Sequence, residues 1–209
     1  SFKCRKNLSR WNSGFCGEDR DLEQSQLVFG IEGLKNTDID RYSLRALTII
    51  LGGGMSSRLF QEIREKRGLC YSIFSSIDAG SDTGSFTVYA GTSEEKLAEL
   101  SNVVIDELRR SIELISQDDL DKARAQIKAG ILMGLESSSN RCERLARTLS
   151  VLGRVVPLTE TIEKINQVSL LDLRKFAEGI FSSPSPALAL YGPISKAPTL
   201  DKLLNRLSS

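Results

Sequence analysis

Residues 69–90 read LCYSIFSSIDAGSDTGSFTVYA, and this stretch decides the fold. From Leu69 onward apolar and polar side chains alternate with a period of two, which is typical of a strand that buries one of its faces. This alternation places Leu69, Tyr71 and Ile73 on one face. The segment GSDTG at 80–84 supplies turn residues, and residues 85–90 return as a partner strand. The stretch therefore predicts a β-hairpin, which makes the sheet at least partly antiparallel.

The sequence before the hairpin predicts one strand and two helices. Alternation over residues 27–31 indicates a strand. The segment TDID at 37–40 has a capping-box pattern, and the helix that it opens runs to about Leu51 and ends at the glycine triplet 52–54. A second short helix over residues 57–66 ends at Gly68.

The sequence after the hairpin is mainly helical. A second capping-box pattern at 92–95 opens a long amphipathic helix, and Ser116 with Asp119 caps the helix that follows. Gly130 and Gly134 lie inside that helix, where they reduce its stability, so we expect them to permit close packing against a neighbour. Further elements are expected as helices over 141–153, 159–167 and 170–180, a strand over 187–191, and a weak helix at 200–207. Strands that cluster apart from a helical block predict an α+β fold: a two-layer sandwich with a mostly antiparallel sheet and helices on one face.

Composition excludes several classes of function. The chain has 209 residues, and its 28 Lys and Arg nearly balance its 27 Asp and Glu, which gives a net charge of +1. This balance gives no reason to expect a nucleic-acid partner or an anionic membrane surface. The sequence contains no histidine. Without imidazole the chain has no His-ligated metal site and no Ser-His-Asp or Cys-His catalysis of its own.

The four cysteines, Cys4, Cys16, Cys70 and Cys142, are scattered and form no CxxC pair. A structural zinc site needs ligands in close pairs, so the interpretation is free thiols in a reducing compartment of the cytoplasmic or mitochondrial-matrix kind. A Cys4–Cys16 bridge is the alternative. The N-terminal segment begins with Ser and lacks an apolar run long enough for a signal peptide or membrane helix, as expected of a piece cut from a longer polypeptide that does not insert into a membrane.

Two other sequence patterns give little support for a ligand-binding or catalytic site. The glycine triplet is followed by MSSR rather than by the lysine that a phosphate-binding loop requires, so a sharp corner is favoured over a ligand cradle. A stand-alone domain for a phosphate ligand is correspondingly disfavoured. Carboxylates gather at helix starts, where the helix dipole favours them, and no pair stands out as a general acid and base.

The run LGGGMSSRLFQEIREKRGLCYS at 51–72 resembles a hallmark of the pitrilysin, insulinase and mitochondrial processing peptidase family, the inverzincin zinc peptidases. The segments DLEQSQLVFG at 21–30 and LYGP at 190–193 also resemble the family, so the resemblance extends from Gly14 to Pro193. Residues 1–21 are polar and mixed in charge, which indicates a linker or entry segment. The resemblance implies a C-terminal peptidase-family domain over 22–194, followed by a C-terminal tail with a weak helix over 195–209.

These peptidases have two similar α+β halves that close around a chamber, and the zinc motif His-x-x-Glu-His lies in the N-terminal half. The absence of histidine then implies that this chain is the C-terminal, non-metal half, and that it is half the family's usual length. The resemblance implies that no cofactor binds here and that zinc belongs to the partner half. The partners are that zinc-binding half, as the same polypeptide or a separate subunit, and a peptide substrate.

The resemblance also implies roles for two residues. Arg64 and Tyr71 match an arginine and a tyrosine seven residues apart that reach towards the substrate near the zinc. A guanidinium offers several donors to a carbonyl or a carboxylate, and a phenol can donate to the scissile carbonyl or to its oxyanion. The structural alternative is a helix-capping arginine and a core tyrosine. Gly52, Gly53 and Gly54 are possible lining of the chamber.

The expected function is the substrate-binding half of a zinc metallopeptidase that cleaves short or unfolded peptides, inactive without the zinc half. The alternative is a non-catalytic scaffold or partner subunit related to the core subunits of the respiratory bc1 complex. The presence of both Arg64 and Tyr71 favours the peptidase, because a scaffold has no need of the pair.

Overall fold

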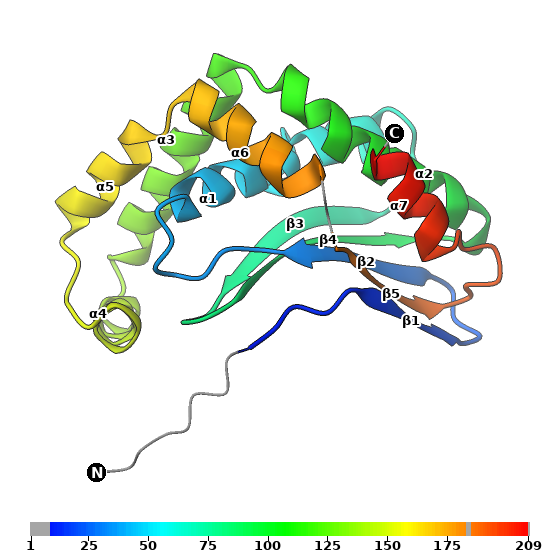
Figure 1. Ribbon diagram of the computed structural model, residues 1–209, viewed down its shortest axis with the longest axis horizontal. Coiled ribbons are helices and arrows are strands. Elements are labelled where there is room, and N and C mark those ends of the chain that lie inside the picture. Colours follow the sequence, from blue (N-terminus) through cyan, green and yellow to red (C-terminus); the bar gives the residue numbers. More distant parts are fainter. Residues whose placement is uncertain (1–8, 183–184, 209) are drawn as a thin grey trace, which may run out of the picture.

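The computed structural model describes residues 9–182 and 185–208, and these form a sheet covered on one face by helices (Figure 1). The sequence prediction of a two-layer α+β fold is confirmed. The strands are β1 (Gly14–Asp19), β2 (Ser25–Glu32), β3 (Ser72–Ala79), β4 (Gly84–Thr92) and β5 (Ala187–Gly192). The helices are α1 (Arg41–Gly52), a short π-helix η1 (Phe60–Glu65), α2 (Glu94–Leu114), α3 (Gln117–Gly134), α4 (Ser138–Leu152), α5 (Leu158–Gln167), α6 (Leu170–Ser182) and α7 (Leu200–Ser208).

The five strands lie in the order β1-β5-β2-β4-β3. All neighbouring pairs are antiparallel except β1 and β5, which are parallel. The predicted hairpin is β3–β4, and its turn is closed by the amide of Gly80, which donates to the carbonyl of Thr83 over 2.7 Å. β1 and β3 are the two edges of the sheet.

The hydrophobic core lies between the sheet and the helices. Alternate residues of β2 and β4 point towards the helical layer and are almost completely buried, as the period of two requires. Burial of each such side chain contributes about 1.5–3 kcal/mol. The main members are Leu27, Phe29, Ile31, Phe86, Val88 and Ala90 from the sheet and Leu44, Leu47, Leu51, Leu97, Leu100 and Leu173 from the helices.

The opposite face of the sheet carries no helix within the described ranges (Figure 1). Its middle is lined by uncharged side chains. Phe74 and Tyr89 stack with their ring centroids 4.8 Å apart, and the hydroxyls of Ser76 and Thr87 are hydrogen-bonded over 2.7 Å. Trp11 lies over one end of this face, beside Gly30. We call this surface the open face.

β1 is a correction to the sequence analysis, which placed residues 1–21 in a linker. Residues 14–19 join the sheet as an edge strand that pairs with β5. All six are exposed and two are glycines, so no alternation of apolar residues marks them as a strand. Residues 1–8 lie outside the described part of the chain, and the boundaries of the peptidase-family domain stay a prediction.

The two predicted capping-box patterns, at 37–40 and 92–95, are wrong. Asp40 and Ser93 precede α1 and α2, but neither side chain bonds to a helix amide. Asp40 has φ −84° and ψ 6°, which is not the extended conformation that a capping side chain requires. The box of Ser116 and Asp119 is confirmed: the Asp119 amide donates to Ser116 Oγ, and the Ser116 amide donates to Asp119 Oδ2 over 2.9 Å.

The close packing expected at Gly130 and Gly134 is also wrong. A methyl group at either position would meet no atom within 4 Å in the described structure. α4 turns away after α3 and has no fully buried residue, so this end of α3 stays uncovered (Figure 1).

The C-terminal helix packs against the rest of the chain. Leu203 and Leu207 of α7 are buried, and Arg206 forms two hydrogen bonds of 2.6 Å to the Asp106 carboxylate of α2. No helix in residues 9–182 and 185–208 is long and apolar enough to cross a membrane. Cys16, Cys70 and Cys142 are free thiols, whereas Cys4, and with it the possible Cys4–Cys16 bridge, lies outside the described residues.

Candidate functional site

The glycine triplet forms the corner between α1 and the segment that carries Arg64. Gly52 is buried at the end of α1, and a methyl group there would lie 2.3 Å from the amide nitrogen of Ser75 in β3. The Ser75 hydroxyl donates to the carbonyl of Thr48 over 2.7 Å, which joins the helix to the strand at the same level. Only glycine permits this approach of helix and strand.

The other two glycines lie nearer the surface. The Gly53 amide donates to the Ile49 carbonyl over 2.9 Å, and the Gly53 carbonyl accepts from Nε2 of Gln126 over 2.7 Å. Gly54 is exposed with φ +155°, a conformation that L side chains rarely adopt. Lining of a chamber stays a proposal, and Gly53 and Gly54 are the two that offer surface for it.

The predicted helix over 57–66 forms, but its core is a π-helical turn rather than an α-helix. The amide of Lys66 donates to the carbonyl of Gln61, five residues earlier, over 3.0 Å. The turn ends at Gly68, as predicted, where φ is +60° and the amide donates to the Arg64 carbonyl over 3.1 Å. π-helical turns are rare and occur frequently at functional sites.

Arg64 lies in η1 with its side chain exposed to solvent. Its guanidinium carbon is 4.7 Å from the centroid of the Phe60 ring, a cation–π contact. Within the described residues no hydrogen bond or ion pair engages the guanidinium, so its donors are open to a ligand. This differs from the structural alternative of a capping arginine.

Tyr71 is 69% exposed and is not a core residue. The alternation of the sequence placed it on one face with Ile73. However, Tyr71 precedes the first residue of β3, so its side chain does not follow the alternation of the strand. Its amide donates to the Gly91 carbonyl over 3.1 Å, which fixes the backbone against β4. The phenol has no hydrogen-bond partner in the part of the chain that the structure describes.

The loop between Arg64 and Tyr71 is attached to the start of α2. Nζ of Lys96 donates to the Gly68 carbonyl over 2.8 Å, and the Thr92 hydroxyl donates to the Leu69 carbonyl. Cys70 is buried in this loop, and its desolvation raises the pKa of the thiol to about 11, against the opposing effect of the Arg64 and Lys96 charges. Cys70 is therefore a neutral thiol with no nucleophilic role at ordinary pH.

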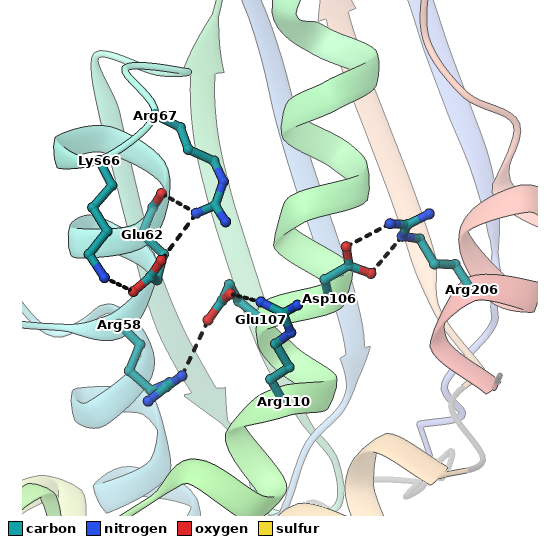
Figure 2. A network of polar contacts seen from close by, with 8 residues as sticks. All are labelled: Arg58, Glu62, Lys66, Arg67, Asp106, Glu107, Arg110 and Arg206. Atoms are coloured by element: carbon teal, nitrogen blue, oxygen red, sulfur yellow. Dashed lines mark hydrogen bonds and ion pairs between the residues drawn. The ribbon is translucent and has the colours of Figure 1, made fainter.

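Glu62 of η1 forms ion pairs with two nearby cations, Lys66 and Arg67 (Figure 2). Its carboxylate accepts from Nζ of Lys66 over 2.5 Å and from Arg67 over 3.1 Å, and Arg67 also donates to the Glu62 carbonyl. The Lys66 hydrogen bond is the main reason that the pKa of Glu62 lies below its usual value. Both cations are thereby engaged, in contrast to Arg64.

Glu107 of α2 contacts Arg58 at the start of the same segment, an interaction that the sequence did not predict (Figure 2). Its side chain is 2% exposed and its carboxylate lies 3.3 Å from Arg58 and 3.4 Å from Arg110. A glutamate three residues after Val104 falls on the apolar stripe of α2, and that unusual position is the signal that sequence reasoning could have used.

No group of three or more His, Cys, Asp or Glu side chains in the described ranges could hold a metal ion. What the site offers is two exposed hydrogen-bond donors on a rigid support. Such an arrangement can bind and orient a polar chain.

The sequence is similar to those of known proteins. Residues 9–127 match the family model described as "Peptidase M16 inactive domain". A Rickettsia bellii protein called "Uncharacterized zinc protease" is 38% identical over 176 residues, which cover 84% of this chain and 42% of that protein. "Uncharacterized zinc protease YmxG" of Bacillus subtilis is 33% identical over 181 residues, which cover 86% of this chain and 44% of that protein. The chain thus spans less than half the length of these curated relatives.

Solved structures show the same fold. A chain of "Complex III2 from Candida albicans, Inz-5 bound" superposes with a TM-score of 0.85 at 18% identity, covering 93% of this chain and 49% of that chain. The peptidase M16 inactive domain from Pseudomonas fluorescens superposes with a TM-score of 0.76 at 20% identity, covering 90% of this chain and 45% of that chain. The matching family model and the sequence relatives together show that the chain belongs to the M16 peptidase family and is its inactive domain.

Proposed function

We propose that the chain is the substrate-binding half of a zinc metallopeptidase and holds short or unfolded peptides beside a zinc ion bound by a partner half. The family membership and the zinc protease relatives support this proposal. The observation that carries it is the state of Arg64 and Tyr71. Both side chains are exposed, and within the described residues neither side chain donates a hydrogen bond to another part of the protein.

The two residue types suit the binding of a peptide during hydrolysis. The Arg64 guanidinium can donate to a carbonyl oxygen, or form two parallel hydrogen bonds to a carboxylate. The Tyr71 phenol can donate to the oxygen of the scissile carbonyl as negative charge develops on it. Zinc in the partner half supplies the Lewis acid and the activated water of such an enzyme. This chain supplies orientation and charge stabilisation.

The test is steady-state peptide cleavage by the assembled enzyme carrying Arg64→Ala or Tyr71→Phe. Loss of one donor to a developing oxyanion lowers turnover by about 10²–10³-fold, and we expect Tyr71→Phe to approach this range. Zinc content, measured by atomic absorption, should not change, because neither residue is a ligand. Unaltered cleavage kinetics in both variants would refute the proposal.

Two matched variants control for general damage. Arg154→Ala removes an arginine that pairs with Glu160 away from this segment, and Tyr191→Phe removes a phenol from β5. Both should keep turnover within about twofold of the parent, since exposed substitutions away from a site change stability little.

The second candidate is a non-catalytic subunit that holds an assembly together, and the similarity to a chain of complex III favours it at the level of the fold. At 18% identity that similarity shows the fold alone. A scaffold makes no use of two open donors seven residues apart. Zinc-dependent cleavage that needs this chain separates the two candidates.

A further inference from the structure

Helix α4 stands away from the body of the molecule, beyond the end of the sheet (Figure 1). Two adjoining cavities of about 220 Å³ and about 610 Å³ lie between α4, α1 and the last residues of β3. Arg45, Arg144, Arg147 and Ile77 line both cavities. The two adjoining cavities are here called the arginine cleft. It is separate from the Arg64 segment.

The arginine cleft is strongly cationic. Its lining contains Arg41 and Arg45 from α1, Arg144 and Arg147 from α4, and a single carboxylate, Glu143. Four positive charges against one negative charge favour an anionic occupant.

Two of the four arginines are held by the protein. Arg41 donates to the Asp38 carbonyl over 3.0 Å and lies over the Tyr42 ring, with its guanidinium carbon 4.5 Å from the centroid. Nη2 of Arg144 donates to Oγ1 of Thr161 over 3.1 Å, across the cleft to α5. These contacts fix the walls and leave the other two arginines to meet a ligand.

Arg45 and Arg147 make no hydrogen bond or ion pair with any residue that the structure describes. Both side chains are exposed to solvent, and the protein atoms around the base of Arg45 desolvate it in part, which lowers its pKa against a smaller opposing effect from Tyr42. An exposed guanidinium without a counter-ion among the described residues is free to form charge-assisted hydrogen bonds to an anion. Arg45 and Arg147 are therefore the two residues that an anionic group would contact.

The lining also contains apolar side chains. Leu44, Ile77, Leu152 and Val156 line the smaller cavity together with the arginines. Inorganic phosphate alone would leave this surface unused, whereas a carboxylate attached to an aliphatic side chain would match both parts. A peptide end, or an acidic residue beside an apolar one, has this chemistry.

The cleft and Tyr71 lie at opposite ends of the same edge strand. Tyr71 directly precedes β3, and Ala79 at its far end lines both cavities. The eight residues of β3 span about 26 Å at about 3.3 Å per residue. An extended peptide that reaches both points therefore has about eight residues between them.

We propose that the arginine cleft binds a carboxylate next to an apolar side chain of a peptide, about eight residues from the part held at Tyr71. This rests on the proposed peptide-holding role and narrows its substrates to peptides that carry such a carboxylate. The carboxylate is a free C-terminus or an acidic side chain.

Fluorescence polarisation with the 209-residue chain tests the proposal. The probes are three peptides whose N-terminus carries an uncharged BODIPY dye: GSGSLL with a free C-terminal carboxylate, GSGSLL amide, and GSGSEL amide. We expect at least one of the two acidic probes to bind about tenfold or more tightly than the neutral amide, as a charge-assisted hydrogen bond provides. The comparison of the free acid with the GSGSEL amide shows which source of carboxylate the cleft takes.

Two variants locate the binding. Arg45→Gln/Arg147→Gln should reduce the preference for the acid to less than about threefold. Val151→Glu, which adds a carboxylate to the lining, should compete with the probe and weaken the acidic peptide alone. The control Lys122→Gln/Lys175→Gln removes the same net charge from α3 and α6 outside the cleft and should leave the preference unchanged.

Four results would overturn the proposal: equal affinity for acid and neutral amide, no binding of any probe up to about 1 mM, an equal loss of preference in the lysine control, or loss of probe binding when the zinc-binding half is added. The last result would mean that the cleft is an interface between the halves. None of these results alters the turnover test of Arg64 and Tyr71, so the two proposals fail separately.

Discussion

Replacement of the buried Glu107 by glutamine should destabilise the protein measurably. Glu107→Gln keeps the shape and one oxygen acceptor of the side chain but removes its charge. The carboxylate is 2% exposed and lies beside Arg58, whose side chain is 20% exposed and whose Nε is buried without a partner within the described residues. The substitution leaves the Arg58 charge without its counter-ion in a place that water reaches poorly.

The magnitude follows from the geometry. Removal of one partner of a fully buried ion pair costs about 3–5 kcal/mol, and a net hydrogen bond to a charged group contributes about 1.5–3 kcal/mol. Both contacts of Glu107 are long, at 3.3 and 3.4 Å, and the Arg110 side chain is 62% exposed, so water screens that pair. The amide also keeps part of the hydrogen bonding. We therefore expect a loss of about 2 kcal/mol in the free energy of unfolding.

Urea unfolding followed by circular dichroism measures this loss. With a slope of about 2 kcal/mol per molar urea, the midpoint should fall by about 1 M. The matched control is Glu113→Gln, on the exposed surface of the same helix, which should change the stability by less than about 0.5 kcal/mol. Equal midpoints for the two variants would show that the Arg58 contact does not stabilise the fold. Arg58→Leu/Glu107→Leu, which removes both charges, should recover part of the loss.

Three further predictions concern glycines and thiols. Gly52→Ala should destabilise the protein by about 1–3 kcal/mol or more, because the added methyl group collides with the β3 backbone. Gly130→Ala, at an uncrowded helix position, should instead stabilise it by about 0.5–1 kcal/mol, and thermal unfolding of both variants checks the opposite signs. With a pKa of about 11, Cys70 should react with iodoacetamide at pH 8 about 100-fold more slowly than a thiol with the ordinary pKa of 9.0, and more slowly than the exposed Cys16 and Cys142, as peptide mass spectrometry would show. Because its folded-state pKa is raised, the neutral thiol's contribution to stability is complete below about pH 9 and is lost as the pH rises towards 11; similar labelling rates for all three cysteines would contradict this burial.

Local patterns predicted most elements of the fold. The β3–β4 hairpin follows from alternation and turn residues, and the cap at Ser116 from residues three positions apart. β1 was not predictable in this way, because it is held by backbone bonds to β5, far away in the sequence, and its own side chains are all exposed. The glycines at 130 and 134 misled because a small residue in a helix shows that close packing is possible, not that a neighbour is present.

The roles of Arg64 and Tyr71 stay a prediction. The sequence could single out these two residues because they stand in a contiguous motif that resembles a known family. The exposure of Tyr71 depends on where β3 begins, and a strand start is less certain than the strand itself. The Arg58–Glu107 contact and the arginine cleft join side chains from separate elements, and only the folded chain brings these together.

The sheet with an open face divides the tasks of the molecule between two sides. Almost all of the buried apolar residues lie on the helical side of the sheet, so substitutions there change the free energy of unfolding (Figure 1). Residues of the open face, such as Ser76 and Thr87, bury little apolar surface and can be exchanged at small energetic cost. A protein built in this way can acquire a new ligand preference on one surface while the scaffold behind it stays unchanged, which makes that surface the natural place for directed evolution to start.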